Sequence, residues 1–367
     1  SGGTITLAAA EVITVNNAAD TIGSVLAGAA TSLTVVGTGT LTLNGSATNT
    51  FTGGLIIAGG TVTLDFSNIA ASTSLINDGR ALTLSGGNLT ILGKTGDNLT
   101  TQTLGNVTVN AGGGTLLINP NGGTSTTLAL GTLAPATAGG SLTIGKALGA
   151  GTGDVIITTT TNKGATDIYA ARIVFADGTA NTGYDWAATE SVASPYTLSA
   201  YSGYTAIAGG TYAGGTDTLN SKITSSVTLD TAAWTTNTLK IEDPAASQTL
   251  DLGTNLLTLT GGGLLVTGTN GTTISGTAGD TRLTAGNGSG TYDLIVQQYN
   301  SGGLEISAPI GNNGANAVNI VKAGTGALTL SGANTFTGTL YINSGDVVLG
   351  NAGALNSTAG SEAAVTF

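Results

Sequence analysis

The stretch AGTGALTLSGANTFTGTLYINSGDVVLGN, residues 323–351, decides the fold of this chain because a second version of it stands near the other end. Residues 36–65 read VGTGTLTLNGSATNTFTGGLIIAGGTVTLD, and the two versions align strand for strand once two extra residues around Ala47 are set aside. Phe51 then matches Phe336, and the apolar positions on either side match as well. An internal repeat of this kind is the sequence signature of a repeat architecture.

Each version holds three short runs in which apolar and small polar residues alternate, at 41–43, 55–57 and 62–64 in the first version. A period of two residues places the apolar side chains on one face of a strand and the polar ones on the other. Gly, Asn and Ser stand between the runs and permit tight turns. The pattern therefore predicts short strands joined by turns, and it lacks the 3.6-residue period of an amphipathic helix.

One such coil cannot stabilise itself, because its few apolar side chains do not offset the conformational entropy lost on ordering the backbone. Coils stacked on one another pair each strand above and below and share one apolar core. We therefore predict an all-β chain that forms a parallel β-helix, or solenoid, of about 12–15 coils.

Two alternative fold classes are weighed against the solenoid. Evenly spaced short strands also occur in sandwiches of two face-packed antiparallel sheets, and a chain this rich in Gly, Thr, Asn and Ser could be disordered. The distant repeat and the scarcity of charged residues, 8% of the chain, favour the solenoid over the sandwich. A hydrophobic fraction of 40%, placed in regular alternation, supplies the core that a disordered chain lacks.

The chain divides into three segments on this basis. Residues 1–157 and 216–367 are predicted as β-helix segments, and each carries one copy of the repeat. Residues 158–215 interrupt the regular pattern and hold half of the aromatic residues, so we predict an irregular, aromatic-rich insertion there. The spacing in YDWAATESV also allows a short helix over residues 185–192.

The aromatic side chains of this insertion have two readings. They can pack against the solenoid, or they can form a carbohydrate-binding surface in which rings stack on sugars while carboxylates bind the hydroxyls. Under the second reading the candidate binding residues are Tyr184, Trp186, Tyr196, Tyr201 and Tyr204.

The composition excludes several kinds of chemistry. The chain has no Cys and no His, which removes disulfides, nucleophile–His pairs and metal sites built on either residue. Acid–base catalysis would need paired carboxylates, and the only adjacent acids, Glu242 and Asp243, are predicted to form a turn after a strand at 239–241. We therefore predict no catalytic residue, no metal ligand and no cofactor, and expect that the chain is not an enzyme.

Charge and hydropathy limit the partners and the location that can be expected. The formal net charge is −11 and the nine basic residues form no cluster, so a nucleic-acid partner is not expected. No apolar run approaches the 18 residues of a membrane-spanning helix. The sequence begins and ends within the repeat pattern and shows no signal peptide, so we expect a segment of a longer secreted protein.

The words GTGALTLSGANTFTG and INSGDVVLGN, within residues 323–351, closely resemble the autotransporter-associated β-strand repeat, also called the passenger-associated transport repeat. Residues 36–65 resemble it well, and the rest of the chain resembles it more loosely. The resemblance implies a right-handed parallel β-helix, export to the bacterial cell surface or beyond, and many copies in a row. The family's motif carries no catalytic residues that could be placed on this sequence.

Three functions follow as expectations. The first is a structural extracellular rod, a segment of a larger autotransporter-like protein that forms or decorates a surface fibre or layer and associates with itself or with neighbouring repeats. The second is an adhesin that binds glycans through the insertion at 158–215. The third is a polysaccharide-active enzyme, which would need acids gathered in a cleft.

Overall fold

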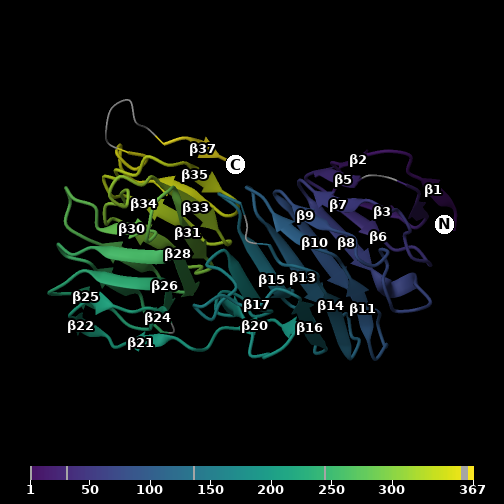
Figure 1. Cartoon of the computed structure of the whole chain (residues 1–367), viewed down its shortest axis with the longest axis horizontal. Helices are drawn as coiled ribbons and strands as arrows, with labels where there is room; N and C mark the ends of the chain where they lie inside the picture. The colour runs from purple at the N-terminus through teal and green to yellow at the C-terminus, as the bar shows by residue number, and fades with distance from the viewer. Residues whose placement is uncertain (1, 30–31, 135–136, 244, 357–362) are drawn as a thin grey trace. The chain divides into compact units, whose positions relative to one another are not determined.

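The computed structural model describes residues 2–29, 32–134, 137–243, 245–356 and 363–367 (Figure 1). Within these ranges the regular elements are β-strands, apart from the single-turn 3₁₀ helix η1 (Phe66–Asn68). The strands wind into a parallel β-solenoid of about 14 turns, which confirms the predicted fold class. No helix in the described ranges has the length and hydropathy needed to cross a membrane.

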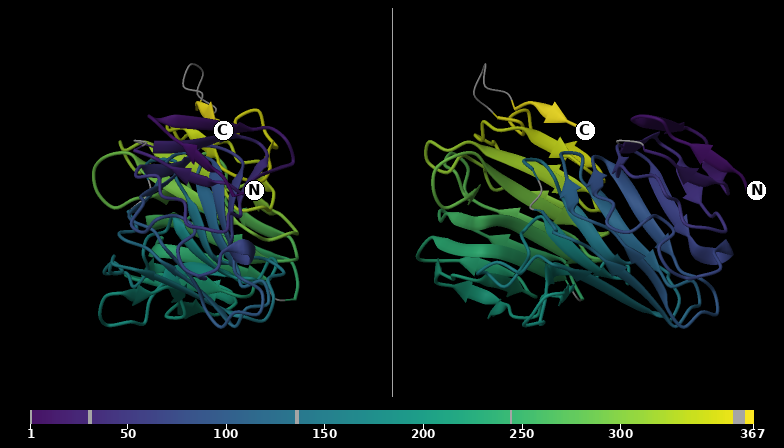
Figure 2. Two further views of the ribbon diagram at one scale, coloured as in Figure 1. Left: turned by 90° about the vertical axis from the view of Figure 1, so that its right-hand side faces the viewer. Right: turned by 45° about the vertical axis from the view of Figure 1, so that its right-hand side comes forward.

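The chain folds as two compact units, and the first comprises residues 1–163, 175–179 and 187–200. Figure 2 shows its strands following one another as successive coils. The strands of this unit are β1 (Thr4–Thr6), β2 (Glu11–Val15), β3 (Ala19–Ile22), β4 (Val25–Ala27), β5 (Ser32–Gly37), β6 (Thr40–Leu43), β7 (Gly54–Ile57), β8 (Thr61–Asp65), β9 (Leu82–Leu84), β10 (Gly87–Leu92), β11 (Thr100–Thr103), β12 (Val107–Val109), β13 (Gly114–Asn119), β14 (Ser125–Ala129), β15 (Leu142–Lys146), β16 (Asp154–Thr159), β19 (Tyr196–Thr197) and β20 (Ser199–Ala200). Two further strands, β17 (Ile173–Asp177) and β18 (Tyr184–Ala188), have residues in both units.

Parallel pairing in the first unit stacks equivalent residues into columns. Leu33, Leu55, Leu82 and Val107 pair in register from β5 through β7 and β9 to β12, and all four side chains are buried. A second column faces the same interior from the sheet of β6, β8, β10, β13 and β15. The alternation read from the sequence therefore generates a continuous core, because every coil presents the same face inward.

The second unit comprises residues 164–174, 180–186 and 201–367. Its strands are β21 (Thr205–Ile207), β22 (Gly210–Tyr212), β23 (Gly215–Thr216), β24 (Asn220–Ile223), β25 (Val227–Leu229), β26 (Trp234–Asp243), β27 (Gln248–Asp251), β28 (Leu257–Gly268), β29 (Thr272–Ser275), β30 (Leu283–Ala285), β31 (Tyr292–Gln298), β32 (Leu304–Ile306), β33 (Val318–Ala323), β34 (Leu328–Leu330), β35 (Leu340–Ile342), β36 (Val347–Leu349) and β37 (Val365–Thr366). The predicted insertion, residues 158–215, is shared between the two units.

Two sheets enclose the core of the second unit. One runs from β22 through β25, β27, β29, β32 and β34 to β36, and places Leu250, Ile274, Ile306 and Leu330 in one buried column. The other contains β24, β26, β28, β31, β33 and β35 in that order (Figure 1). Both contribute to a single apolar cluster, which is the core that the repeat pattern requires.

The repeat carries a buried asparagine that joins three successive coils. In the first copy the side-chain Oδ1 of Asn49 accepts a hydrogen bond from the backbone N–H of Leu26 at 2.8 Å. The same side chain donates from Nδ2 to the carbonyl oxygen of Leu75 at 2.9 Å. Leu26 lies one coil before Asn49 and Leu75 one coil after it, so one amide satisfies backbone groups on both sides.

The second copy repeats this arrangement at Asn334. Its Oδ1 accepts from the backbone N–H of Ile310 at 2.8 Å, and its Nδ2 donates to the carbonyl oxygen of Ala354 at 2.7 Å. The phenylalanine two residues further on, Phe51 in one copy and Phe336 in the other, is fully buried. The shared letters NTFTG therefore encode one polar and one apolar anchor at a place where the coil has no strand of its own.

The first shared glycine of the repeat is required by close approach of neighbouring coils. Gly37 and Gly324 have φ values of 106° and 77°, which L-residues rarely adopt. A Cβ at Gly37 would lie 2.2 Å from the carbonyl oxygen of Val15, and one at Gly324 would lie 2.4 Å from that of Gln298. A side chain at either position would therefore push apart two stacked turns.

The second copy also buries a lysine. Lys322 pairs in register with Val296, so it occupies an inward-facing column of the second unit. Burial lowers the pKa of Lys322 to about 8, while the charge of Asp346 opposes the shift. Its Nζ donates at 2.7–3.2 Å to the carbonyl oxygens of Gly324, Ser344 and Ala323.

We expect Lys322→Met to change how stability depends on pH. Between about pH 8 and the ordinary lysine pKa of 10.5, the unfolded chain holds more protons at this residue than the folded protein does. The free energy of unfolding of the original protein should therefore rise with pH in that window, and the Met variant should lack this rise. Chemical denaturation at a series of pH values measures both slopes. Equal slopes would contradict the lowered pKa of Lys322.

The predicted helix over residues 185–192 is wrong. Residues Tyr184–Ala188 form β18, and the residues that follow are not helical. Ala187 and Ala188 pair antiparallel with Ala200 and Ser199 of β20. This strand pairing outweighs the local helical spacing, because intrinsic propensity is weak compared with tertiary contacts.

Candidate functional site

The sheet of β24, β26, β28, β31 and β33 is buried on its outer face as well as its inner one. Lys240, Leu265 and Gln297 pair in register on this outer face, and all three are buried. The cover is made by residues 164–174 and 180–186 of the same unit, which we call the covering segment. It hydrogen-bonds the unit at several points, for example from the side chains of Gln297 and Asn220 to the carbonyl oxygens of Arg172 and Thr166.

Apolar and aromatic contacts hold the covering segment on the sheet. Ala171 joins a small cluster with Ile295 and Val321. The rings of Tyr184 and Tyr299 stack with centroids 3.7 Å apart and an interplanar angle of 12°. A strand glycine, Gly263, makes room for this packing, because a Cβ there would meet the Ala171 side chain at 2.7 Å and the Trp186 ring at 2.8 Å.

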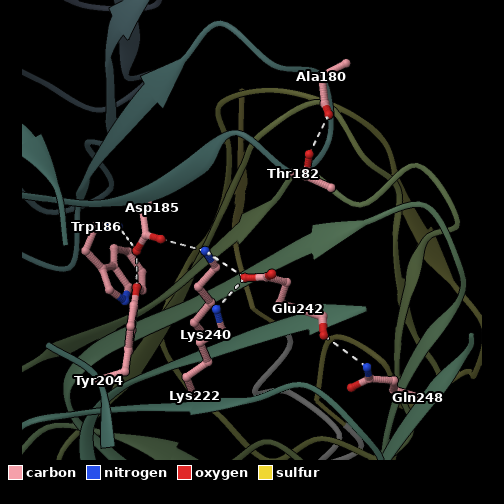
Figure 3. A network of polar contacts seen from close by, with 9 residues as sticks. All are labelled: Ala180, Thr182, Asp185, Trp186, Tyr204, Lys222, Lys240, Glu242 and Gln248. Carbon is pink, nitrogen blue, oxygen red and sulfur yellow. Dashed lines mark hydrogen bonds and ion pairs between the residues drawn. The ribbon is translucent and has the colours of Figure 1, made fainter. Parts of the chain in front are cut away.

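A charged network lies beside the Trp186 ring (Figure 3). The Nζ of Lys240 lies 2.6 Å from Oδ2 of Asp185 in the covering segment and 3.2 Å from Oε2 of Glu242. Lys222 lies one coil away in register with Lys240, and its Nζ is 2.7 Å from the same oxygen of Glu242. The phenol of Tyr204 donates to Oδ1 of Asp185, and both lysine Nζ atoms stand 5.9 Å from the centre of the Tyr204 ring.

The electrostatics of the network fix the protonation of two groups. Burial, and after it the charge of Asp185, raise the pKa of Tyr204 well above its ordinary value, so the phenol stays protonated and donates. Burial acts to raise the pKa of Glu242, but hydrogen bonds and charge from Lys222 and Lys240 outweigh it and hold that pKa below its ordinary value. Glu242 is therefore a carboxylate near neutral pH.

A second ion pair anchors the other end of the covering segment. Arg172 Nη2 lies 2.7 Å from Oδ2 of Asp293. Beside it is a pocket of about 160 Å³ whose lining includes Arg172, Asp293, Tyr292 and two glycines of β28, Gly261 and Gly262. The pocket is too small for a saccharide chain. The two charged side chains in its lining, Arg172 and Asp293, already pair with each other.

The structure gathers four of the five candidate aromatic residues in the second unit, and places Tyr196 in the first. Trp186 and Tyr201 are buried, so neither ring offers a face to a sugar. Tyr184 stacks on Tyr299, and Tyr204 packs edge-on against Tyr201 with ring centroids 4.8 Å apart. Four of the five rings that were predicted to bind a ligand therefore pack against protein.

The sequence patterns did not single out Lys240 or Lys222, and they placed Glu242 only in a predicted turn. The prediction that Glu242 and Asp243 form a turn is wrong, because both lie in β26. Asp243 is buried and accepts from the backbone N–H groups of Thr269 and Asn270 at 2.9 Å. The alternation in LKIED could have indicated that lysine and glutamate share a face, but the identity of their partner depends on the fold.

The chemistry open to this site is that of amines, carboxylates and a phenol. Across the described residues, no three or more Asp or Glu side chains gather in a way that could hold a metal ion. The network combines two ammonium groups with two carboxylates, and thus carries no excess charge to attract an ionic ligand. Its contacts instead tie the covering segment to the sheet.

The fold and the stacked columns define a class of protein, the parallel β-solenoids built from coil-length repeats. Within this class, residues 33–64 and 320–349 match the passenger-associated-transport-repeat family. The chain thus carries two copies of this repeat, which confirms the resemblance read from residues 36–65 and 323–351. Searches among curated proteins and among solved structures found no match.

Proposed function

We propose that this chain is a structural segment of an exported bacterial surface protein of the autotransporter type. Its stacked coils would supply length and a cell-surface or extracellular scaffold, and its partners would be neighbouring repeats or further copies of itself. The observation that carries the proposal is the pair of passenger-associated transport repeats, each built into a continuous solenoid core.

The outward side chains of the coils support a structural role. Thr42, Thr63 and Thr90 stand in register on the outer side of β6, β8 and β10. Small, uncharged side chains of this kind allow close lateral packing of one surface on another. Strand-paired backbone is also poorly accessible to proteases, which suits an extracellular location.

The location is tested on the source bacterium with an antibody against this chain. We expect labelling of intact cells, and we expect external protease to remove that label while a cytoplasmic marker stays intact. Labelling that appears only after permeabilisation would contradict export of this segment.

The partner is tested separately with the purified chain. Sedimentation over a concentration series, with electron micrographs of the same samples, should show concentration-dependent rods or layers if the chain associates with itself. A monomer that binds saccharides on a glycan array would favour the adhesin instead, and hydrolysis or elimination of a polysaccharide would favour the enzyme.

A further inference from the structure

We propose that Lys240 and Asp185 form a covalent isopeptide bond that fastens the covering segment to the solenoid of the second unit. The two groups already touch, with Nζ of Lys240 2.6 Å from Oδ2 of Asp185. They are 55 residues apart in the sequence, so the bond would close a large loop. The inference concerns the chemistry of this site and does not depend on the proposed function.

The two groups are largely shielded from water, as the reaction needs. The Lys240 side chain is 3% exposed and that of Asp185 is 17% exposed. Transfer of one proton from the ammonium to the carboxylate removes two charges from a poorly hydrated site, and leaves a neutral amine beside a neutral acid. The fixed geometry then replaces an encounter in solution with a reaction between neighbours, which is worth several orders of magnitude in rate.

The two oxygens of Asp185 are held in different ways, as acyl transfer requires. Oδ1 accepts from the backbone N–H of Trp186 at 2.9 Å and from the Tyr204 phenol, whereas Oδ2 faces Lys240 (Figure 3). Two donors on one oxygen form a site that stabilises the negative charge developing there when the amine attacks. The raised pKa of Tyr204 keeps its proton in place for this purpose.

Glu242 is placed to move the second proton. Its Oε2 lies 3.2 Å from Nζ of Lys240, and Glu242 is ionised, since its pKa is held below the ordinary value. A carboxylate within hydrogen-bond reach of the attacking nitrogen is the arrangement of a general base. Lys94 and Asp97 also form an ion pair, but their atoms lie 3.9 Å apart, and among the described residues no second carboxylate is within ion-pair distance of the Lys94 amine.

The reaction balances without any further reactant. The Lys240 ammonium gives one proton to Oδ2 of Asp185, and the Nζ lone pair then attacks Cγ while electrons move onto Oδ1. Glu242 accepts a second proton from Nζ. The carbonyl re-forms, the Oδ2 hydroxyl leaves with the proton returned by Glu242 as one water, and Nζ keeps its third hydrogen as an amide.

Mass spectrometry of the denatured full chain tests the bond. We expect the intact mass to be lower than the sequence mass by one water, and we expect Lys240→Arg and Asp185→Ala to restore the full sequence mass. Glu242→Gln should also show the full mass while its circular dichroism stays that of the original, and the control Lys94→Arg should still lose one water.

Tryptic digestion locates the bond. An unreacted chain yields residues 173–222, 223–240 and 241–282 as separate peptides, because trypsin cleaves after Lys240. The bond would block that cleavage and join 173–222 to 223–282 in one branched peptide. The proposal is overturned if the folded protein has its full sequence mass, or if the lost water maps to any pair other than Lys240 and Asp185.

Discussion

Replacement of Phe336 by alanine is expected to destabilise the second unit by about 3–5 kcal/mol, which is the usual cost of deleting a fully buried phenylalanine. Phe336 is buried in the apolar core between the coils and stands at the same place in the repeat as Phe51. The loss combines the transfer free energy of the ring with the cavity that remains, since backbone hydrogen bonds hold the coils on either side at a fixed spacing.

Chemical denaturation measures this loss, and two further variants calibrate it. Phe336→Leu should lose less because leucine fills part of the cavity. Phe367→Ala should be nearly neutral, since Phe367 is 87% exposed. A Phe336→Ala protein as stable as the Phe367→Ala protein would show that the ring does not anchor the coil.

Replacement of Asn334 by alanine should cost about 1–3 kcal/mol for each of the two buried backbone groups left without a partner. The N–H of Ile310 and the carbonyl oxygen of Ala354 both lose the amide that joins them. Because these groups belong to the coils before and after Asn334, the effect should extend over three coils. Native-state hydrogen exchange should therefore show reduced protection at Ile310 as well as at the site of the change.

A substitution of similar size separates the loss of the two hydrogen bonds from the loss of side-chain volume. Asn334→Asp keeps an acceptor for Ile310 but places a carboxylate oxygen against the carbonyl oxygen of Ala354, so it should also be destabilised near neutral pH. Asn49→Ala should be destabilised less, because the carbonyl oxygen of Leu75 keeps a hydrogen bond from the backbone N–H of Asn49 and only the N–H of Leu26 loses its partner. Alanine at the exposed Asn17 should change little. Equal stability of the Asn17 and Asn334 variants would refute the role of the buried amide.

The repeat could be interpreted from the sequence because its signal is periodic and local. Alternation of Leu41 with Thr42 decides which side chain points inward in a strand, and stacking of coils brings Leu41 above its equivalent Val62 with no further information. The glycines and the NTFTG letters recur because each coil meets the same neighbours. The two copies of the repeat can therefore be recognised from the sequence alone.

The covering segment could not be predicted in the same way. Asp185 and Lys240 are far apart in the sequence and carry no periodic pattern, so their 2.6 Å contact depends on how the covering segment returns to the sheet. The local spacing around Trp186 even suggested a helix, which strand pairing overrides. Likewise, the aromatic residues suggested a binding surface, and packing buried two of their rings.

The amino-acid sequence by itself determined the strands, the inward and outward faces and the repeat that stacks them, since these follow from residue spacing and from contacts between equivalent positions. Only the tertiary structure decided which outer face is covered, which charges meet there and which aromatic rings lose contact with solvent. Those features arise from contacts between non-equivalent residues, and the position of such residues along the chain carries no signal of where they meet.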